Sequence, residues 1–165
     1  MVMHHRRSRA VVSLAAVAAL SMAFAGCGSN DEGGTTGATG GATGSKTTIE
    51  VSEQEFAILP ASASAPAGDV TFNVTNTGPD EVHEFVVLAT DLAPDALPTT
   101  KDGSADEEGT GVEPVDELED IAVGDTASLT VSLDPGTYVF ICNIVDKDTG
   151  TSHYHAGMRV GFTVE

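Results

Sequence analysis

The stretch Val139-Phe-Ile-Cys-Asn-Ile-Val-Asp-Lys-Asp-Thr-Gly-Thr-Ser-His-Tyr-His-Ala-Gly-Met158 joins the end of an apolar strand to several residues that bind soft metals. Cys142 closes the apolar run, and Cys27 is the only other cysteine of the chain. His153 follows in the same stretch, five positions before Met158. Thiolate, thioether and imidazole ligands together suit copper. The stretch therefore predicts most of a copper site.

A copper site with one thiolate and a weak axial thioether needs two imidazoles. His83 is the only histidine between Cys27 and the C-terminal stretch. We therefore expect one copper ion bound by His83, Cys142, His153 and Met158. His155 remains an alternative, because in an extended segment it would lie on the same face as His153. We place it outside the site, since only His153 leaves a gap of four residues before Met158.

The sequence around these residues alternates between apolar and polar positions, as strands with one buried face do. The alternation covers 49–51, 70–74, 83–87, 129–133, 138–142 and 160–164. Turn signals separate the runs, for example Asn76-Thr-Gly-Pro79 and Asp134-Pro-Gly136. The pattern predicts an all-β fold, an antiparallel two-sheet β-sandwich with Greek-key connections.

A long interruption, 91–120, separates the third and fourth of these runs, and nine acidic residues lie between Asp102 and Asp120. Connections longer than about 12–15 residues without structure are uncommon in a compact domain. We expect either a short helix over 114–120 or an acidic surface loop, and we favour a solvated, mobile insertion. Such a loop could dock a lysine-rich partner.

The N-terminal region has the pattern of a bacterial export signal. Three arginines within residues 1–9 precede an uncharged apolar run over 10–25, which is short for a membrane span. The following Phe24-Ala-Gly-Cys27 resembles a lipoprotein cleavage box, although an ordinary signal peptide is the alternative. We expect a signal peptide over 1–26, lipidation of Cys27, a flexible Gly/Thr-rich linker over 27–45 and a folded domain over 46–165. The domain would then lie on the outer face of the bacterial cytoplasmic membrane, held there by its lipid anchor alone.

The chain is strongly acidic, with 25 Asp and Glu against 7 Lys and Arg and a formal charge of −18. Removal of residues 1–26 takes away three arginines and no acidic residue, which leaves 4 basic residues and a charge of −21. Such a charge excludes nucleic acid and anionic lipid as partners by electrostatic attraction, and it favours a cationic partner. Lipidation of Cys27 would leave Cys142 without a disulfide partner.

Three segments together resemble the cupredoxins, the blue-copper family of plastocyanin and azurin. They are His83-Glu-Phe-Val86, the strand end Tyr138-Val-Phe-Ile-Cys142-Asn143, and the block His153-Tyr-His-Ala-Gly157-Met158. The resemblance covers residues 46–165 and implies a cupredoxin-like sandwich. It also implies that Cys142 is the equatorial thiolate, His83 and His153 the two imidazoles, and Met158 the axial ligand. Ten residues separate Cys142 from His153, whereas many members of the family have only a few there.

The resemblance implies a type 1 copper protein that carries single electrons between redox partners, with no substrate pocket and no catalytic base. We therefore do not expect an enzyme. Copper storage, delivery or sensing is the alternative, and it would need an exchangeable site. A thiol enzyme using Cys142 and His153 would lack a nucleophile motif and would leave His83 and Met158 unexplained. A cupredoxin-shaped interaction module without metal is disfavoured because all four ligand types are present.

Overall fold

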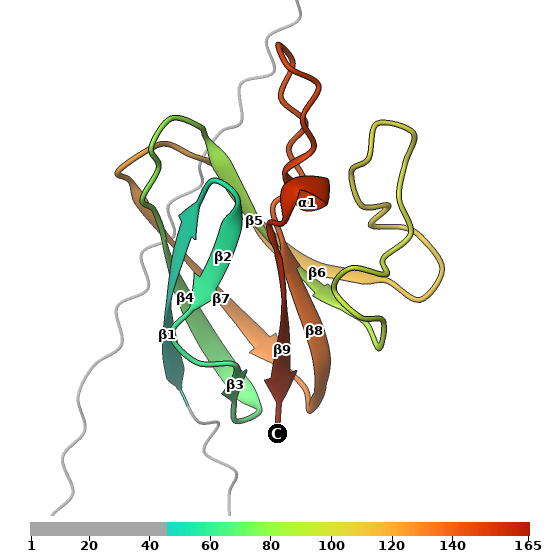
Figure 1. Cartoon of the computed structure of the whole chain (residues 1–165). Helices are drawn as coiled ribbons and strands as arrows, with labels where there is room; N and C mark the ends of the chain where they lie inside the picture. The colour runs from blue at the N-terminus through green and yellow to red at the C-terminus, as the bar shows by residue number, and fades with distance from the viewer. Residues whose placement is uncertain (1–45) are drawn as a thin grey trace, which may run out of the picture. The chain divides into compact units, whose positions relative to one another are not determined.

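The computed structural model describes residues 46–165, which form a sandwich of two β-sheets (Figure 1). The predicted signal peptide over 1–26, the lipidation site Cys27 and the linker over 27–45 lie outside the described residues. Among residues 46–165, no helix is long and apolar enough to cross a membrane.

Four strands form the first sheet in the order β2-β1-β4-β7, and five form the second in the order β3-β9-β8-β5-β6. The strands of the first sheet are β1 (Thr47–Gln54), β2 (Ala57–Pro60), β4 (Gly68–Asn76) and β7 (Thr126–Leu133). The strands of the second sheet are β3 (Ser64–Ala65), β5 (His83–Ala89), β6 (Glu113–Ile121), β8 (Gly136–Ile141) and β9 (Arg159–Val164). The predicted all-β sandwich with Greek-key crossings is confirmed.

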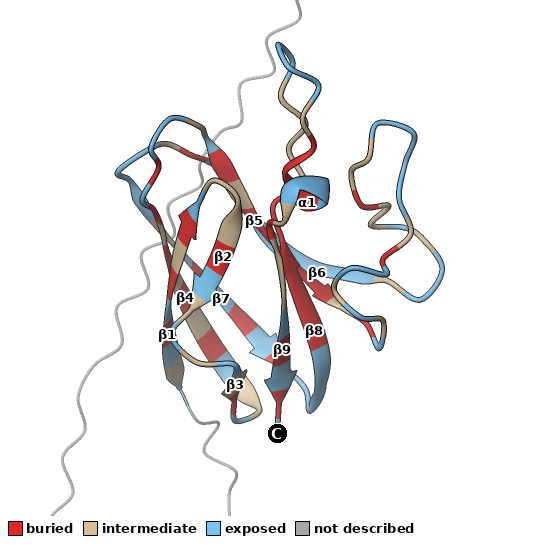
Figure 2. Ribbon diagram, in the orientation of Figure 1, coloured by how far each residue is buried: buried red, intermediate tan, exposed pale blue. Residues whose placement is uncertain are grey.

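Four phenylalanines fill the space between the sheets. The ring of Phe72 in β4 lies 5.0–5.7 Å, between centroids, from the rings of Phe85, Phe140 and Phe162 in the opposite sheet. Their tilted and edge-to-face arrangements are those that aromatic pairs prefer. Buried and exposed residues alternate along most strands, as the sequence pattern predicts (Figure 2). The two sheets thus share one apolar core.

Two strand pairs run parallel, which the sequence did not predict. β1 pairs parallel with β4, and β3 pairs parallel with β9. After β1 the chain turns back as β2, moves to the other sheet as β3 and returns beside β1 as β4, in the direction of β1. The chain therefore makes an even number of reversals between β1 and β4, and the antiparallel prediction holds only for the remaining pairs.

The predicted helix over 114–120 is wrong, and the alternative of a loop over the whole interruption holds only before residue 113. Residues 113–121 form β6, which pairs antiparallel with β5 at the edge of the second sheet. The acidic side chains of β6 are exposed, and Ile121 is its one buried residue. The preceding segment, 90–112, packs on the outside of the sheet through the buried side chains of Leu97 and Ala105, in contact with a cluster that includes Tyr154. An edge strand without a fully covered face tolerates charge on most positions, which hides the period-two pattern.

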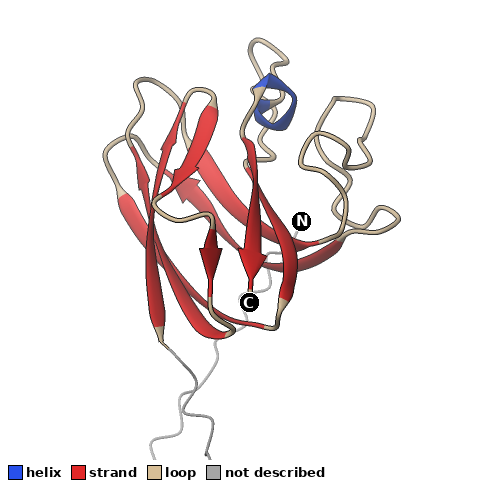
Figure 3. Cartoon of the chain, turned by 60° about the horizontal axis from the view of Figure 1, so that its bottom comes forward, coloured by secondary structure: helices blue, strands red, loops and turns tan. Residues whose placement is uncertain are grey.

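One end of the sandwich collects all the predicted ligands. β5 begins at His83, β8 ends one residue before Cys142, and the helical turn α1 (His153–Ala156) leads into β9. Because β8 runs antiparallel to both β5 and β9, the start of β5, the end of β8 and the start of β9 lie at the same end of the sheet. Figure 3 shows α1 beyond the strands at this end.

Candidate metal centre

Residues 143–152 form a hairpin that returns the chain from Cys142 to His153. Val145 pairs with Ser152 across the hairpin, and the backbone N–H of Asp146 donates to the carbonyl of Thr151 at 2.8 Å. At its base, the N–H of His153 donates to the carbonyl of Ile144 at 2.9 Å. Because these bonds close the hairpin, its ten residues place His153 beside Cys142.

Three donor atoms converge at this end of the sandwich. Nδ1 of His153 lies 3.3 Å from Nδ1 of His83 and 3.3 Å from Sγ of Cys142. Sγ of Cys142 lies 3.9 Å from Nδ1 of His83. Metal–nitrogen bonds are about 2.0 Å and metal–sulfur bonds about 2.3 Å, so donors spread around one ion lie roughly 3.3–3.9 Å apart. The three side chains are therefore spaced to bind a metal ion.

The cluster is removed from solvent. The side chains of His83, Cys142 and Met158 are fully buried, and His153 is 1% exposed. Burial raises the pKa of the Cys142 thiol to about 12, and the nearby carboxyls of Glu53 and Glu84 add to the shift against two backbone hydrogen bonds. Burial lowers the pKa of His83 to about 4. Without a cation, the Cys142 thiol and the His83 imidazole are thus uncharged at neutral pH.

Met158 is fixed to both neighbouring ligand candidates through its backbone. The N–H of Met158 donates to the carbonyl of His153 at 2.9 Å, and the N–H of Cys142 donates to the carbonyl of Met158 at 3.1 Å. Gly157 makes the turn possible, since its φ of 133° is a conformation that L-residues rarely adopt. The role of Met158 as axial ligand stays a prediction.

His155 lies outside the cluster and is exposed. The segment that carries it is helical and not extended, because Ser152 caps α1 by accepting a hydrogen bond from the N–H of His155 at 3.1 Å. Residues two apart on a helix face different directions, so His153 and His155 diverge. The four-residue α1 is too short for a sequence pattern to reveal.

Glu84 contacts the site through its backbone, while its side chain bonds the residue that follows Cys142. Its backbone N–H approaches Sγ of Cys142 at 3.5 Å, and its Oε1 accepts a hydrogen bond from the N–H of Asn143 at 2.7 Å. The β5–β6 register shifts between His83 and Phe85, so regular pairing is interrupted at Glu84. Burial, reinforced by neighbouring acidic residues, raises the pKa of Glu84 to about 7.

Two further carboxylates, missed by the sequence analysis, face the imidazoles from behind. Oε2 of Glu81 lies 2.5 Å from Nε2 of His153, and Oε1 of Glu55 lies 3.7 Å from Nε2 of His83. Both belong to connections beside the site, and nothing in their sequence context separates them from the other acidic residues.

The 90–112 segment is fastened to both ends of the ligand hairpin. Asn143, next to Cys142, exchanges two hydrogen bonds with the backbone of Ala105, at 2.6 and 3.0 Å. Ser152, next to His153, donates through Oγ to the carbonyl of Gly103 at 2.8 Å. This part of the predicted mobile insertion therefore braces the candidate centre.

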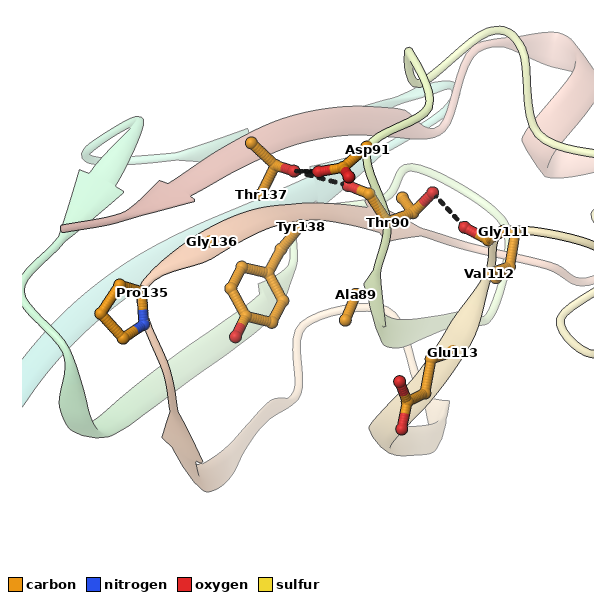
Figure 4. Close-up of a pocket in the computed structure, with 10 residues that line it drawn as sticks. All are labelled: Ala89, Thr90, Asp91, Gly111, Val112, Glu113, Pro135, Gly136, Thr137 and Tyr138. Atoms are coloured by element: carbon orange, nitrogen blue, oxygen red, sulfur yellow. Dashed lines mark hydrogen bonds between the residues drawn. The ribbon is translucent and has the colours of Figure 1, made fainter.

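An acidic hollow of about 610 Å³ lies beside the cluster and reaches His153. Its charged lining residues are Asp80, Glu81, Asp120, Asp146, Lys147 and Asp148. A second hollow, of about 440 Å³, lies at the far end of β5, near Thr90 (Figure 4). There Thr90 donates through Oγ1 to the carbonyl of Gly111 at 2.6 Å, and Thr137 donates to Asp91 at 2.8 Å. That second hollow contains no candidate ligand.

No family model matches the chain, and no curated protein matches it. Solved structures that resemble it are cupredoxins. A reduced auracyanin from Roseiflexus castenholzii is 22% identical, with 73% of this chain and 96% of that chain covered and a TM-score of 0.49. Auracyanin A, a "blue" copper protein from Chloroflexus aurantiacus, is 19% identical, with 73% and 100% covered and a TM-score of 0.48. Rusticyanin from Thiobacillus ferrooxidans is 18% identical, with 73% and 79% covered and a TM-score of 0.49.

Proposed function

We propose that residues 46–165 form a type 1 copper domain that carries single electrons between redox proteins. The observation that carries this proposal is the convergence of Sγ of Cys142 and Nδ1 of both His83 and His153 within 3.3–3.9 Å. One thiolate and two imidazoles suit copper in both of its common oxidation states. Met158, buried in the same corner, is the proposed weak axial ligand.

Copper held there would supply a one-electron couple, accepting one electron as Cu(II) and releasing it as Cu(I). The protein's part is to keep the ligands in place during this change. His83 is held by β5, Cys142 by the end of β8, and His153 by the closed hairpin. Such preorganised ligands need little rearrangement when the charge changes, which favours fast electron transfer.

Burial favours a carrier over an enzyme and over a copper store. A catalytic metal site keeps an open position for water or substrate. The four proposed ligands are at most 1% exposed, so a substrate would have no direct approach to the metal. Storage or delivery, the alternative function, would require rapid exchange of copper, and the same burial disfavours it.

The proposed redox partner is a cationic protein that binds over the acidic hollow beside His153. Five carboxylates and one lysine line this hollow, and one of its walls is an imidazole of the proposed centre. Opposite charge would speed the encounter and bring the partner close to the copper. The rate of electron transfer to a lysine-rich redox protein should then fall steeply as ionic strength rises, whereas the rate with an acidic redox protein should be low and should rise.

We further propose that the domain works outside the cytoplasmic membrane, tethered through lipid on Cys27. The export pattern over 1–26 and the Phe24-Ala-Gly-Cys27 box support this location. Incorporation of labelled fatty acid into the wild-type chain, but not into Cys27→Ser, would test the tether.

The copper proposal is tested by absorption and paramagnetic resonance on the purified protein with one equivalent of Cu(II). We expect an intense visible thiolate-to-copper band that bleaches on reduction. Cys142→Ser should abolish the band, whereas His155→Ala should retain it as a matched control. Weak, tetragonal copper signals without the band would favour storage, and an unchanged spectrum in Cys142→Ser would refute the ligand assignment.

A further inference from the structure

Both imidazoles of the candidate centre use one ring nitrogen toward the cluster and the other toward a carboxylate. The three distances that define the cluster all involve Nδ1. The opposite nitrogen, Nε2, faces Glu81 in His153 and Glu55 in His83, at 2.5 and 3.7 Å. The arrangement is the same for two histidines from different elements.

The carboxylates are the close charged neighbours of these nitrogens. Within residues 46–165, the part of the chain that the structure describes, neither Nε2 makes a hydrogen bond of regular geometry. Bulk water has almost no access to either ring, since His83 is fully buried and His153 is 1% exposed. A buried N–H without an acceptor costs about 1–3 kcal/mol, so the protonation pattern of each ring depends on the carboxylate behind it.

An ionised carboxylate accepts hydrogen bonds and donates none. Facing Nε2, it therefore favours the tautomer that carries the proton on Nε2. The lone pair of a neutral ring is then on Nδ1, which points at Sγ of Cys142 and at the other imidazole. This is the tautomer that a metal ion at the cluster requires.

The backbone that carries Glu81 is itself held in place. Oε1 of Glu55 accepts hydrogen bonds from the N–H groups of Glu81 and Asp80, at 2.7 and 3.1 Å. On the other side, the fully buried Asn76 donates through Nδ2 to the carbonyl of Glu81 at 2.8 Å. Glu55 therefore both faces His83 and fixes the segment from which Glu81 reaches His153.

We propose that Glu81 is a positioning residue of the copper centre, which selects the Nε2–H tautomer of His153 and lowers the reduction potential of the metal. Glu55, at 3.7 Å from His83, is beyond hydrogen-bond distance and adds only the electrostatic part of this effect. A negative charge behind a ligand stabilises Cu(II), the more positive state, relative to Cu(I). Glu81 is the stronger of the two because its oxygen is the closer. This proposal rests on the copper function proposed above.

The first test needs no copper. Nitrogen-15 NMR of the metal-free protein should find His153 as the Nε2–H tautomer in the wild type and in Glu81→Gln, whose amide oxygen still accepts. In Glu81→Ala the preference should be lost. A wild-type His153 protonated on Nδ1 would overturn the proposal, whatever the copper experiments show.

The second test is the reduction potential of the copper-loaded protein. Glu81→Gln should shift the equilibrium toward Cu(I) at least tenfold, which is about 59 mV for one electron. Asp148→Asn, which removes a charge from the same hollow without contact to either imidazole, should shift it less than threefold. Equal shifts in the two variants would overturn the special role of Glu81 and leave the copper function intact. A wild-type protein without the thiolate-to-copper band would instead refute the copper function.

Discussion

Glu84 and Asn143 join the two strands that deliver candidate ligands: Oε1 of Glu84 accepts a hydrogen bond from the backbone N–H of Asn143 at 2.7 Å. Each residue directly follows a candidate ligand, His83 in one case and Cys142 in the other. The bond therefore sets the spacing between the start of β5 and the end of β8 at the point where the cluster forms. It also gives a partly buried carboxylate a specific partner.

Glu84→Ala should lower the free energy of unfolding of the metal-free protein by about 1–3 kcal/mol, because the N–H of Asn143 loses its acceptor. Glu84→Gln keeps an acceptor and removes the repulsion from Glu107, Glu117 and Glu119, so its free energy of unfolding should stay close to that of the wild type. Urea unfolding at pH 7 measures the free energy of unfolding of both variants. Equal losses in the two variants would show that the hydrogen bond contributes nothing.

Copper affinity should rise with pH. The pKa of the Cys142 thiol is about 12, so at neutral pH the S–H must release its proton when the metal binds. The pKa of His83, about 4, means that this imidazole adds no proton release above pH 5. We expect about a tenfold gain in apparent affinity per pH unit between pH 6 and 8, measured by competition with a chelator of known pH dependence. An affinity independent of pH would mean that Cys142 is not a ligand.

Glu53 should make the metal-free protein less stable as pH rises. The side chain is fully buried on the core face of β1, and neither carboxyl oxygen has a hydrogen-bond partner among residues 46–165. Burial, followed by the charge of Glu84, raises its pKa to about 8. Between pH 4.5 and 8 the folded protein thus keeps a proton that the unfolded chain releases, so the free energy of unfolding falls over this range and levels above it.

Glu53→Gln should remove this pH dependence, because the amide is neutral throughout. Between pH 5 and pH 8 the free energy of unfolding of the variant should rise, relative to that of the wild type, by an amount on the order of 3 kcal/mol. The basis is roughly 1.4 kcal/mol for each pH unit over which the folded wild type retains the proton. Urea unfolding of the metal-free proteins at the two pH values gives the comparison. Parallel pH profiles for wild type and variant would contradict the assignment.

Gly157→Ala should disturb the turn between His153 and Met158. A Cβ at this position would lie 3.0 Å from the carbonyl oxygen of Phe56, and the φ of 133° is unfavourable for alanine. We expect a loss of about 1–3 kcal/mol in stability and, in the copper-loaded protein, a shifted visible band. Gly150→Ala is a suitable comparison, since it has positive φ but open space around it, and its spectrum should be unchanged.

The residue types of the candidate centre could be predicted because soft ligands are few in this chain. One cysteine, three histidines and one methionine after Cys27 leave little choice, and three of the four chosen side chains do meet. The sandwich could be predicted because strands such as β1, β4 and β7 alternate between buried and more exposed positions. The strand β6 could not be predicted from the sequence, because the exposed side chains of this edge strand show no hydrophobic period.

The carboxylates around the histidines could not be predicted for a different reason. Their position depends on how two connections fold against the sandwich end, which is a property of tertiary packing. Glu81 lies two residues before His83 yet contacts His153, and Glu55 contacts His83 from the other sheet's β1–β2 turn.

The bonds of Ala105 to Asn143 and of Gly103 to Ser152 also bear on how this domain could be re-engineered. Because the 90–112 excursion is tied down at two points, length changes should be harmless only outside its 103–105 anchor. If the 103–105 anchor were removed, the hairpin between Cys142 and His153 would lose its support. A shorter hairpin would then be needed to hold these two residues in place. In this protein the 103–105 anchor and the long hairpin form one structural unit, and the anchor cannot be removed while the hairpin keeps its length.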